Sequence, residues 1–122
     1  MERYLHGVDL FNRFYFWEAH EVWEALWKSH PPESDPALFV QGLINLSASL
    51  LKLHMGAFPS SQKLWNAAES RLLWFQGDPW MGVSVGRLLQ EVHVYLDPAE
   101  ENFPPRIGAA TPSIRLILPS DR

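Results

Sequence analysis

Residues 15–27 read YFWEAHEVWEALW, and this stretch decides the fold class. Placed on a helix at about 100° per residue, its aromatic side chains and its histidine gather on one side. The residues within an arc of roughly 120° are Phe16, Ala19, His20, Trp23, Leu26 and Trp27. The stretch therefore predicts an amphipathic helix, ending near His30, with an aromatic inner face.

The acidic residues of this helix do not form one cluster. Glu24 falls at the edge of the inner arc beside His20, whereas Glu18 and Glu21 fall towards the other side. We therefore expect His20 to point inward among aromatic side chains, with Glu24 next to it. Glu18 and Glu21 are expected to point outward or across a rim.

A second helix is predicted from about residue 37 to residue 54 or 55, after the turn PPESDP at 31–36. Ser34 or Asp35 is its expected N-cap, Pro36 its first helical residue and Gly56 its C-cap. A polar stripe at spacings of three and four comprises Gln41, Asn45, Ser49 and Lys52. The opposite face is aliphatic, so several neighbouring elements must cover it.

The two histidines of these helices invite comparison. His54 falls in the aliphatic arc of the second helix. In an antiparallel hairpin around residues 31–36, His20 lies level with Ser47, and His54 lies near Asn12 and Phe16. The two histidines then differ in height by roughly 10 Å at about 1.5 Å per residue, so direct contact is not expected, although both could line one elongated pocket.

The rest of the chain predicts two more helices, a short turn and a tail. Asp9 is expected to cap a turn through LFNRF at 10–14. Ser60 or Ser61 is expected to cap a helix through residues 62–75, and Ser84 to begin another at residues 85–96. Residues 97–122 contain five prolines and no helical period, which indicates an extended tail. Its apolar segment IRLIL, 114–118, should dock on the body or on a partner chain, because exposed it would promote aggregation.

These elements predict an all-α protein: a small antiparallel bundle of four to five helices over residues 1–96, with an extended Pro-rich C-terminal tail over residues 97–122. A length of 122 residues suits one domain with a real core.

Composition narrows the function classes. The net charge of −4 and the absence of any basic run argue against nucleic-acid binding. The chain has no cysteine, so disulfides and thiolate zinc sites are excluded. The N-terminus lacks the apolar run of a signal peptide, and the apolar stretch 37–56 is interrupted by Gln41, Asn45 and Lys52. We therefore expect a soluble, cytoplasmic protein without a membrane span.

The two central segments, LFNRFYFWEAHEVWEALW and FVQGLINLSASLLKLHMG, resemble the bacterial and archaeal domain of unknown function 309. The matching positions are Phe11, Asn12, Glu18, Ala19, His20, Glu21, Glu24, Trp27, Gln41, Gly42, Leu43, Ile44 and His54. The resemblance covers roughly residues 5–75 and implies a small all-helical fold with a polar set around His20. It implies no reaction. Phe14 stands where the family usually has glycine, which leaves open whether the chain bends sharply there.

The sequence leaves several roles open for the candidate polar site, which comprises Glu18, His20, Glu21, Glu24, Trp27, Gln41 and His54. His20 and Glu24 are the metal candidates, because residues at i and i+4 can share one ion, with Glu21 or His54 as a further ligand. Di-iron bundles need Glu-x-x-His motifs on two helices, and this chain has none. No cofactor is expected; a divalent metal is the one left open.

A histidine beside a carboxylate also suits general base catalysis, but the sequence offers no partner nucleophile or phosphate loop. The third role is structural, in which a His20–Glu24 pair fixes the helix register. Trp23 and Trp27 are then core residues, and Trp65, Trp74 and Trp80 pack in the core or loops. Trp17 lies at the margin of the inner arc and is equally a candidate interface residue.

The main hypothesis is a non-enzymatic binding or self-association module, a homo-oligomer whose small-molecule ligand, if it has one, is unknown. The alternative is a small metal-dependent or hydrolase-like enzyme using His20, Glu21, Glu24 and His54.

Overall fold

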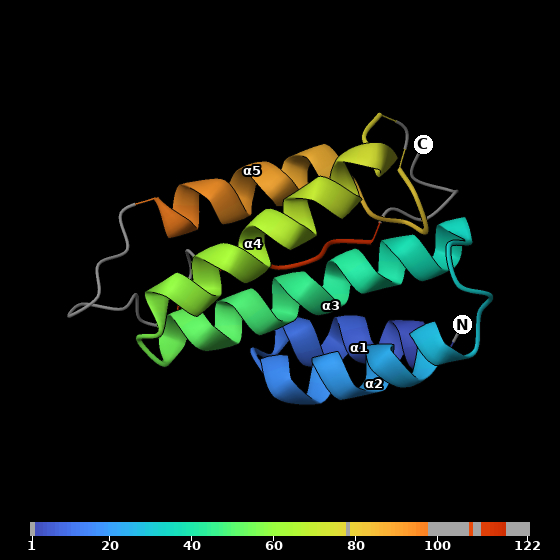
Figure 1. Ribbon diagram of the computed structural model, residues 1–122, viewed down its shortest axis with the longest axis horizontal. Coiled ribbons are helices and arrows are strands. Elements are labelled where there is room, and N and C mark those ends of the chain that lie inside the picture. Colours follow the sequence, from blue (N-terminus) through green and yellow to red (C-terminus); the bar gives the residue numbers. More distant parts are fainter. Residues whose placement is uncertain (1, 78, 98–107, 109–110, 117–122) are drawn as a thin grey trace.

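The computed structural model describes residues 2–77, 79–97, 108 and 111–116. The elements in that part are α1 (Glu2–Asn12), α2 (Phe16–Lys28), α3 (Asp35–His54), α4 (Phe58–Leu72), the 3-10 helix η1 (Leu73–Phe75) and α5 (Val85–Leu96). Successive α-helices run antiparallel, and α3 lies between the α1–α2 hairpin on one side and α4 and α5 on the other (Figure 1). The predicted all-α bundle is confirmed.

Helix α3 forms the centre of the core. Its large apolar side chains are almost completely buried, among them Phe39, Val40, Leu43, Leu46, Leu50 and Leu53. By length and composition alone α3 could cross a membrane, but 61% of its most apolar window is buried inside the structure. A core helix of a soluble protein has this pattern. The N-cap is Ser34, one of the two residues expected, since its Oγ accepts from the Ala37 amide. The helix begins at Asp35, one residue before the expected Pro36, and its C-cap is Met55 rather than the expected Gly56, which follows with φ of 80°.

The first helix corrects the expectation for the N-terminus. We expected Asp9 to cap a short turn, but Asp9 lies inside α1 and is exposed. The chain bends sharply at Phe14, whose φ of 68° is in the left-handed region. The amides of Phe14 and Tyr15 donate to the carbonyls of Phe11 and Leu10, the bond pattern of a Schellman helix end. The bend is therefore present although Phe14 stands where glycine is favoured.

Three serines join the helices to each other. Ser47 Oγ donates to the Phe16 carbonyl at 2.6 Å, and Ser49 and Ser61 each donate to the carbonyl of the other at 2.8 and 2.9 Å. The expected polar stripe on α3 is thus wrong for Ser49, which is completely buried against α4. The expected serine caps of α4 are also wrong. That helix begins at Phe58, so Ser60 and Ser61 lie inside it.

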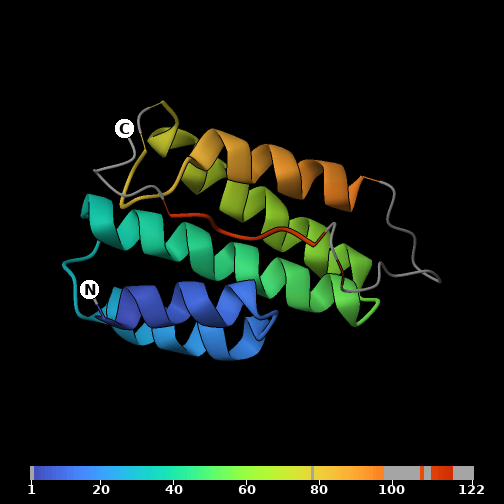
Figure 2. The same cartoon turned by 180° about the vertical axis from the view of Figure 1, so that it is seen from behind.

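The part of the tail that is described packs on the body, one of the two outcomes expected for the IRLIL segment. The side-chain amide of Asn12 forms hydrogen bonds with both backbone groups of Ile114. Its Nδ2 donates to the Ile114 carbonyl at 2.7 Å, and its Oδ1 accepts from the Ile114 amide at 2.6 Å. The Ile114 side chain is 3% exposed, and Leu116 pairs with Val83 in an isolated bridge. The segment runs beside α3 in both views (Figures 1 and 2). The last two residues of the IRLIL segment, Ile117 and Leu118, lie outside the described residues. Residues 98–107, near the start of the predicted tail, also lie outside them.

An aromatic cluster closes the end of the bundle where α3 begins. Phe39, Phe75 and Trp80 have ring centroids 4.7–5.3 Å apart. The turn that follows Trp80 is tied to α1, because the Tyr4 hydroxyl donates to the Met81 carbonyl at 2.9 Å. Burial raises the pKa of Tyr4, so its hydroxyl keeps its proton for this bond. The aromatic cluster and this bond therefore join α3, η1 and the turn at residues 80–83 to α1.

Candidate functional site

His20 lies at the margin of α2 rather than in the core. Its side chain is 23% exposed, its ring stacks on Trp17 with centroids 5.5 Å apart, and its Nε2 lies 3.5 Å from Glu24 Oε2. Trp17 is itself 53% exposed. The expectation that His20 points into an aromatic interior is therefore wrong, because its side chain lies closer to the surface than expected. The expectation that Glu24 lies beside it is correct. Lys28 Nζ also contacts Glu24, at 3.1 Å, so the carboxylate serves two cations when His20 is protonated.

The other candidates on these helices spread over several surfaces. Glu18 and Glu21 are exposed, as expected from their helical positions. Trp27 is half-buried and packs against the core, and Gln41 is half-buried on α3. The structure thus pairs His20 with Glu24, while Glu18 and Glu21 face solvent.

His54 belongs to a different neighbourhood. Its ring stacks on Phe16 with centroids 5.7 Å apart and an interplanar angle of 8°, which confirms the expected proximity. Its Nε2 lies 2.6 Å from the Tyr95 hydroxyl. His20 and His54 share no ring contact or hydrogen bond within the described residues, in agreement with their predicted separation.

The His54 bond is the first link of a chain that reaches the tail. The Tyr95 oxygen lies 3.3 Å from Thr111 Oγ1, which accepts from the Gly108 amide at 2.9 Å. Burial raises the pKa of Tyr95, with Thr111 opposing, so the phenol stays protonated. One consistent direction follows: Gly108 donates to Thr111, Thr111 to Tyr95, and Tyr95 to His54 Nε2. Nothing in the sequence pairs these positions, because they lie on α3, α5 and the tail.

We expect the free energy of unfolding to fall in mild acid because of His54. Burial lowers the pKa of His54 from its ordinary value of 6.5, and the nearby Leu50 carbonyl opposes this in part. Below pH 6.5 the unfolded chain therefore binds more protons than the folded one, and stability is lost as the pH falls towards the folded-state pKa. Urea denaturation from pH 5 to 8 measures the effect.

The variant His54→Gln should show a weaker dependence on pH in that window than the unmodified chain. His93→Gln, which replaces an exposed histidine on α5, is the matched control and should retain the full dependence. Equal pH slopes for His54→Gln and the unmodified chain would contradict the prediction.

Three buried polar atoms of the described residues have no partner in hydrogen-bond geometry: His20 Nδ1, Asn45 Oδ1 and His54 Nδ1. The last of these is nevertheless close enough to the Leu50 carbonyl for that group to favour a protonated ring. An unsatisfied buried polar atom costs about 1–3 kcal/mol. The same part of the chain holds no group of three His, Cys, Asp or Glu residues that could hold a metal ion. The metal candidates His20 and Glu24 therefore form a pair without the third ligand considered for them, whether Glu21 or His54.

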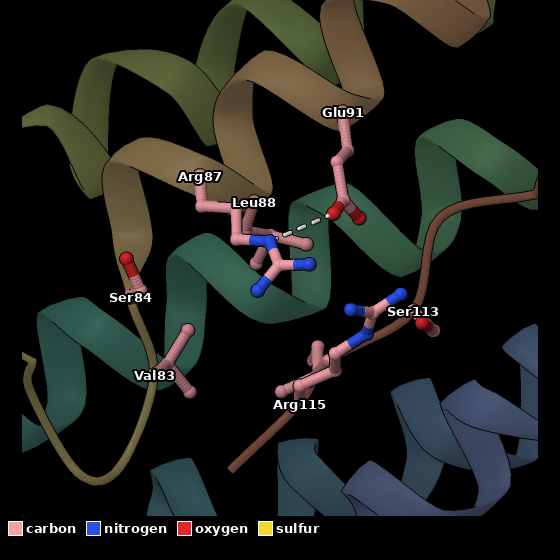
Figure 3. A pocket seen from close by; sticks show the side chains of 8 residues that line it. Val83, Ser84, Arg87, Leu88, Glu91, Ser113 and Arg115 are labelled. Carbon is pink, nitrogen blue, oxygen red and sulfur yellow. Dashed lines mark hydrogen bonds and ion pairs between the residues drawn. The ribbon is translucent and has the colours of Figure 1, made fainter. Parts of the chain in front are cut away.

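A small cavity lies between α5 and the tail (Figure 3). Arg87 Nε donates to Glu91 Oε1 at 3.1 Å along its upper edge, and Arg115 of the tail faces them. Its volume of about 40 Å³ leaves room for a few water molecules at most. This cavity is a small gap where the tail packs against α5 rather than a site for an organic ligand.

Two larger hollows flank Trp74, which sequence reasoning had placed in the core or a loop contact. Trp74 is 86% exposed, so that expectation is wrong. One hollow of about 470 Å³ is lined by Asp35, Leu38, Trp74, Phe75, Gln76 and Trp80. The other, of about 290 Å³, is lined by Leu38, Ser70, Arg71, Trp74 and Phe75. One signal was available: residues 72–75 are all apolar, and four consecutive helical residues cannot share one buried face.

The fold and these surfaces define a class: a small all-α bundle with a half-exposed His–Glu pair on one helix and an exposed tryptophan between two hollows. Within this class, the chain belongs to the family described as Domain of unknown function (DUF309), whose model matches residues 4–64. The expected family is confirmed. No curated protein and no solved structure matches the chain.

Proposed function

We propose that the protein is a non-enzymatic, cytoplasmic binding module that self-associates, and that the surface around Trp74 makes the contact. The observation that carries this proposal is the exposure of Trp74, at 86%, between two hollows. Tryptophan is enriched at the centres of protein interfaces, where its large apolar surface is buried by a partner. Leu73 next to it is also exposed, which enlarges the apolar surface.

The arrangement of the polar candidates also supports a binding role over catalysis. Of the four residues considered for an enzyme, His20 contacts Glu24, Glu21 points to solvent, and His54 bonds to Tyr95. The proposed role of the His20–Glu24 pair is structural: it links successive turns of α2 on the outer face of that helix. The exposed Glu18 and Glu21 add negative charge to the same helix and favour solubility.

The variant Trp74→Ala should weaken self-association roughly tenfold or more, because truncation of a central tryptophan removes a large buried area. Sedimentation or light scattering across a concentration series measures this. At a concentration where both proteins are monomeric, the melting temperature should change little, since the side chain is almost free of contacts within one chain.

Val94→Ala is the matched control, because Val94 is 59% exposed on α5 and lies outside both hollows. It should associate like the unmodified chain. A protein that stays monomeric at high concentration would overturn the proposed self-association.

A further inference from the structure

We propose that the partner at the Trp74 surface is a second copy of this chain in a closed two-fold dimer, in which Asp35 of each copy meets Arg71 of the other. This rests on the self-association proposed above and specifies its geometry. The surface around Trp74 consists of the two hollows and the residues that line them.

The two hollows differ in the charge at their borders. Trp74, Leu38 and Phe75 line both of them, and the exposed Trp74 is the ridge between them. Asp35 lines only the larger hollow, and Arg71 lines only the smaller one. Charge therefore changes from negative to positive across the ridge.

A surface with this polarity is complementary to itself. In a two-fold contact residue i of one copy meets residue j of the other, and j meets i. A rotation of 180° about an axis near the ridge brings Asp35 of one copy towards Arg71 of the other, twice. Within the described residues neither side chain is ion-paired, and Arg71 donates only one hydrogen bond, from its guanidinium to the Ala67 carbonyl at 3.3 Å.

The shapes fit the same arrangement. The exposed indole of Trp74 projects from η1, and the larger hollow beside it, of about 470 Å³, is within the size range of sites that hold small organic groups. Each copy thus offers one projecting ring and one hollow. Phe75 and Trp80 also line that hollow, with their ring centroids 4.7 Å apart, so it presents aromatic side chains to an incoming ring.

Charge reversal in the full-length chain tests the pairing. Asp35→Arg and Arg71→Asp, each alone, should weaken self-association roughly tenfold, because each places two like charges opposite each other in the dimer. A mixture of the two variants should associate about as tightly as the unmodified chain, since both contacts of the mixed dimer then join opposite charges. Sedimentation equilibrium of each variant and of the equimolar mixture provides the measurement, with circular dichroism to check that each variant is folded.

The outcomes separate the two proposals. An unmodified chain that is always monomeric contradicts self-association itself. A dimer that both reversals leave unchanged, or that mixing fails to restore, contradicts the two-fold pairing while self-association stands. The variant Trp17→Ala tests the exposed tryptophan of α2. If Trp17→Ala loses the dimer and Trp74→Ala keeps it, the contact lies on α2 and this proposal is wrong. If a chain ending at Leu116 loses the dimer, the contact needs residues 117–122 and the pairing as described is wrong.

Discussion

Replacing Gly7 with alanine is expected to lower the free energy of unfolding by about 3 kcal/mol. Gly7 lies inside α1, where a Cβ atom would stand 2.0 Å from Trp23 Nε1 and 2.4 Å from its Cδ1. No side chain can remain at those distances, so the indole of Trp23 must move. Trp23 is completely buried, and its Nε1 donates to the Tyr4 carbonyl at 3.2 Å. The change therefore both overpacks the core and breaks a buried hydrogen bond.

Equilibrium urea denaturation followed by tryptophan fluorescence measures this loss. Gly86→Ala is the matched control, because Gly86 lies in α5 with nothing within 4 Å of a Cβ atom. Alanine is the better helix former, so this control should stabilise the protein by roughly 0.5–1 kcal/mol. A Gly7→Ala protein as stable as the Gly86→Ala control would show that α1 and α2 are not packed as described.

Replacing Asn12 with alanine is expected to cost about 2–3 kcal/mol and to release the tail. The Asn12 amide makes two short hydrogen bonds to the backbone of Ile114, across 102 residues of sequence. Alanine leaves both the amide and the carbonyl of Ile114 without these partners. Asn12→Asp should be almost as harmful, because a carboxylate can accept from the Ile114 amide but cannot donate to its carbonyl.

Hydrogen exchange at the Ile114 amide, together with denaturation, distinguishes release of the tail from a general loss of stability. Asn66→Ala is the control, since Asn66 is exposed on α4 and bonds only to Gln62 among the described residues. Its effect should stay within about 0.5 kcal/mol. If the Ile114 amide of Asn12→Ala stays as protected from hydrogen exchange as in the unmodified chain, Asn12 does not hold the tail in place.

The periodicity of the chain was sufficient to predict α2 and α3, because their inner faces repeat at helical spacing. The motifs of these two helices indicated the family, Ser34 was one of the two residues expected to cap α3, and the hairpin alignment placed His54 near Phe16. Each of these depends on residues close in sequence or on one hairpin, where equal distances from the turn fix the alignment.

The beginning of the chain shows why other elements escaped prediction. Gly7 lowers the helix propensity of residues 2–12 by about 1 kcal/mol relative to alanine, and Asp9 is a common N-cap, so local signals favoured a short turn. The structure instead uses Gly7 to admit Trp23, which lies 16 positions later in the sequence. Tertiary packing here outweighs local propensity. The position of His20 was misjudged for a related reason, because helical spacing gives direction around the axis but not depth below the surface.

The sequence by itself determined the all-α class and the outward direction of Glu18 and Glu21, since both follow from periodicity within single helices. It also determined the hairpin of α2 and α3, because the turn at residues 31–36 is too short for any other arrangement of the two helices. Only the tertiary structure decided that His54 bonds to Tyr95, that Asn12 holds Ile114, and that Trp74 is exposed between two hollows. The two hydrogen-bonded pairs join residues 41 and 102 positions apart, and the exposure of Trp74 depends on how η1 sits against α3. Such contacts depend on how helices pack against one another, which no local pattern of residues specifies.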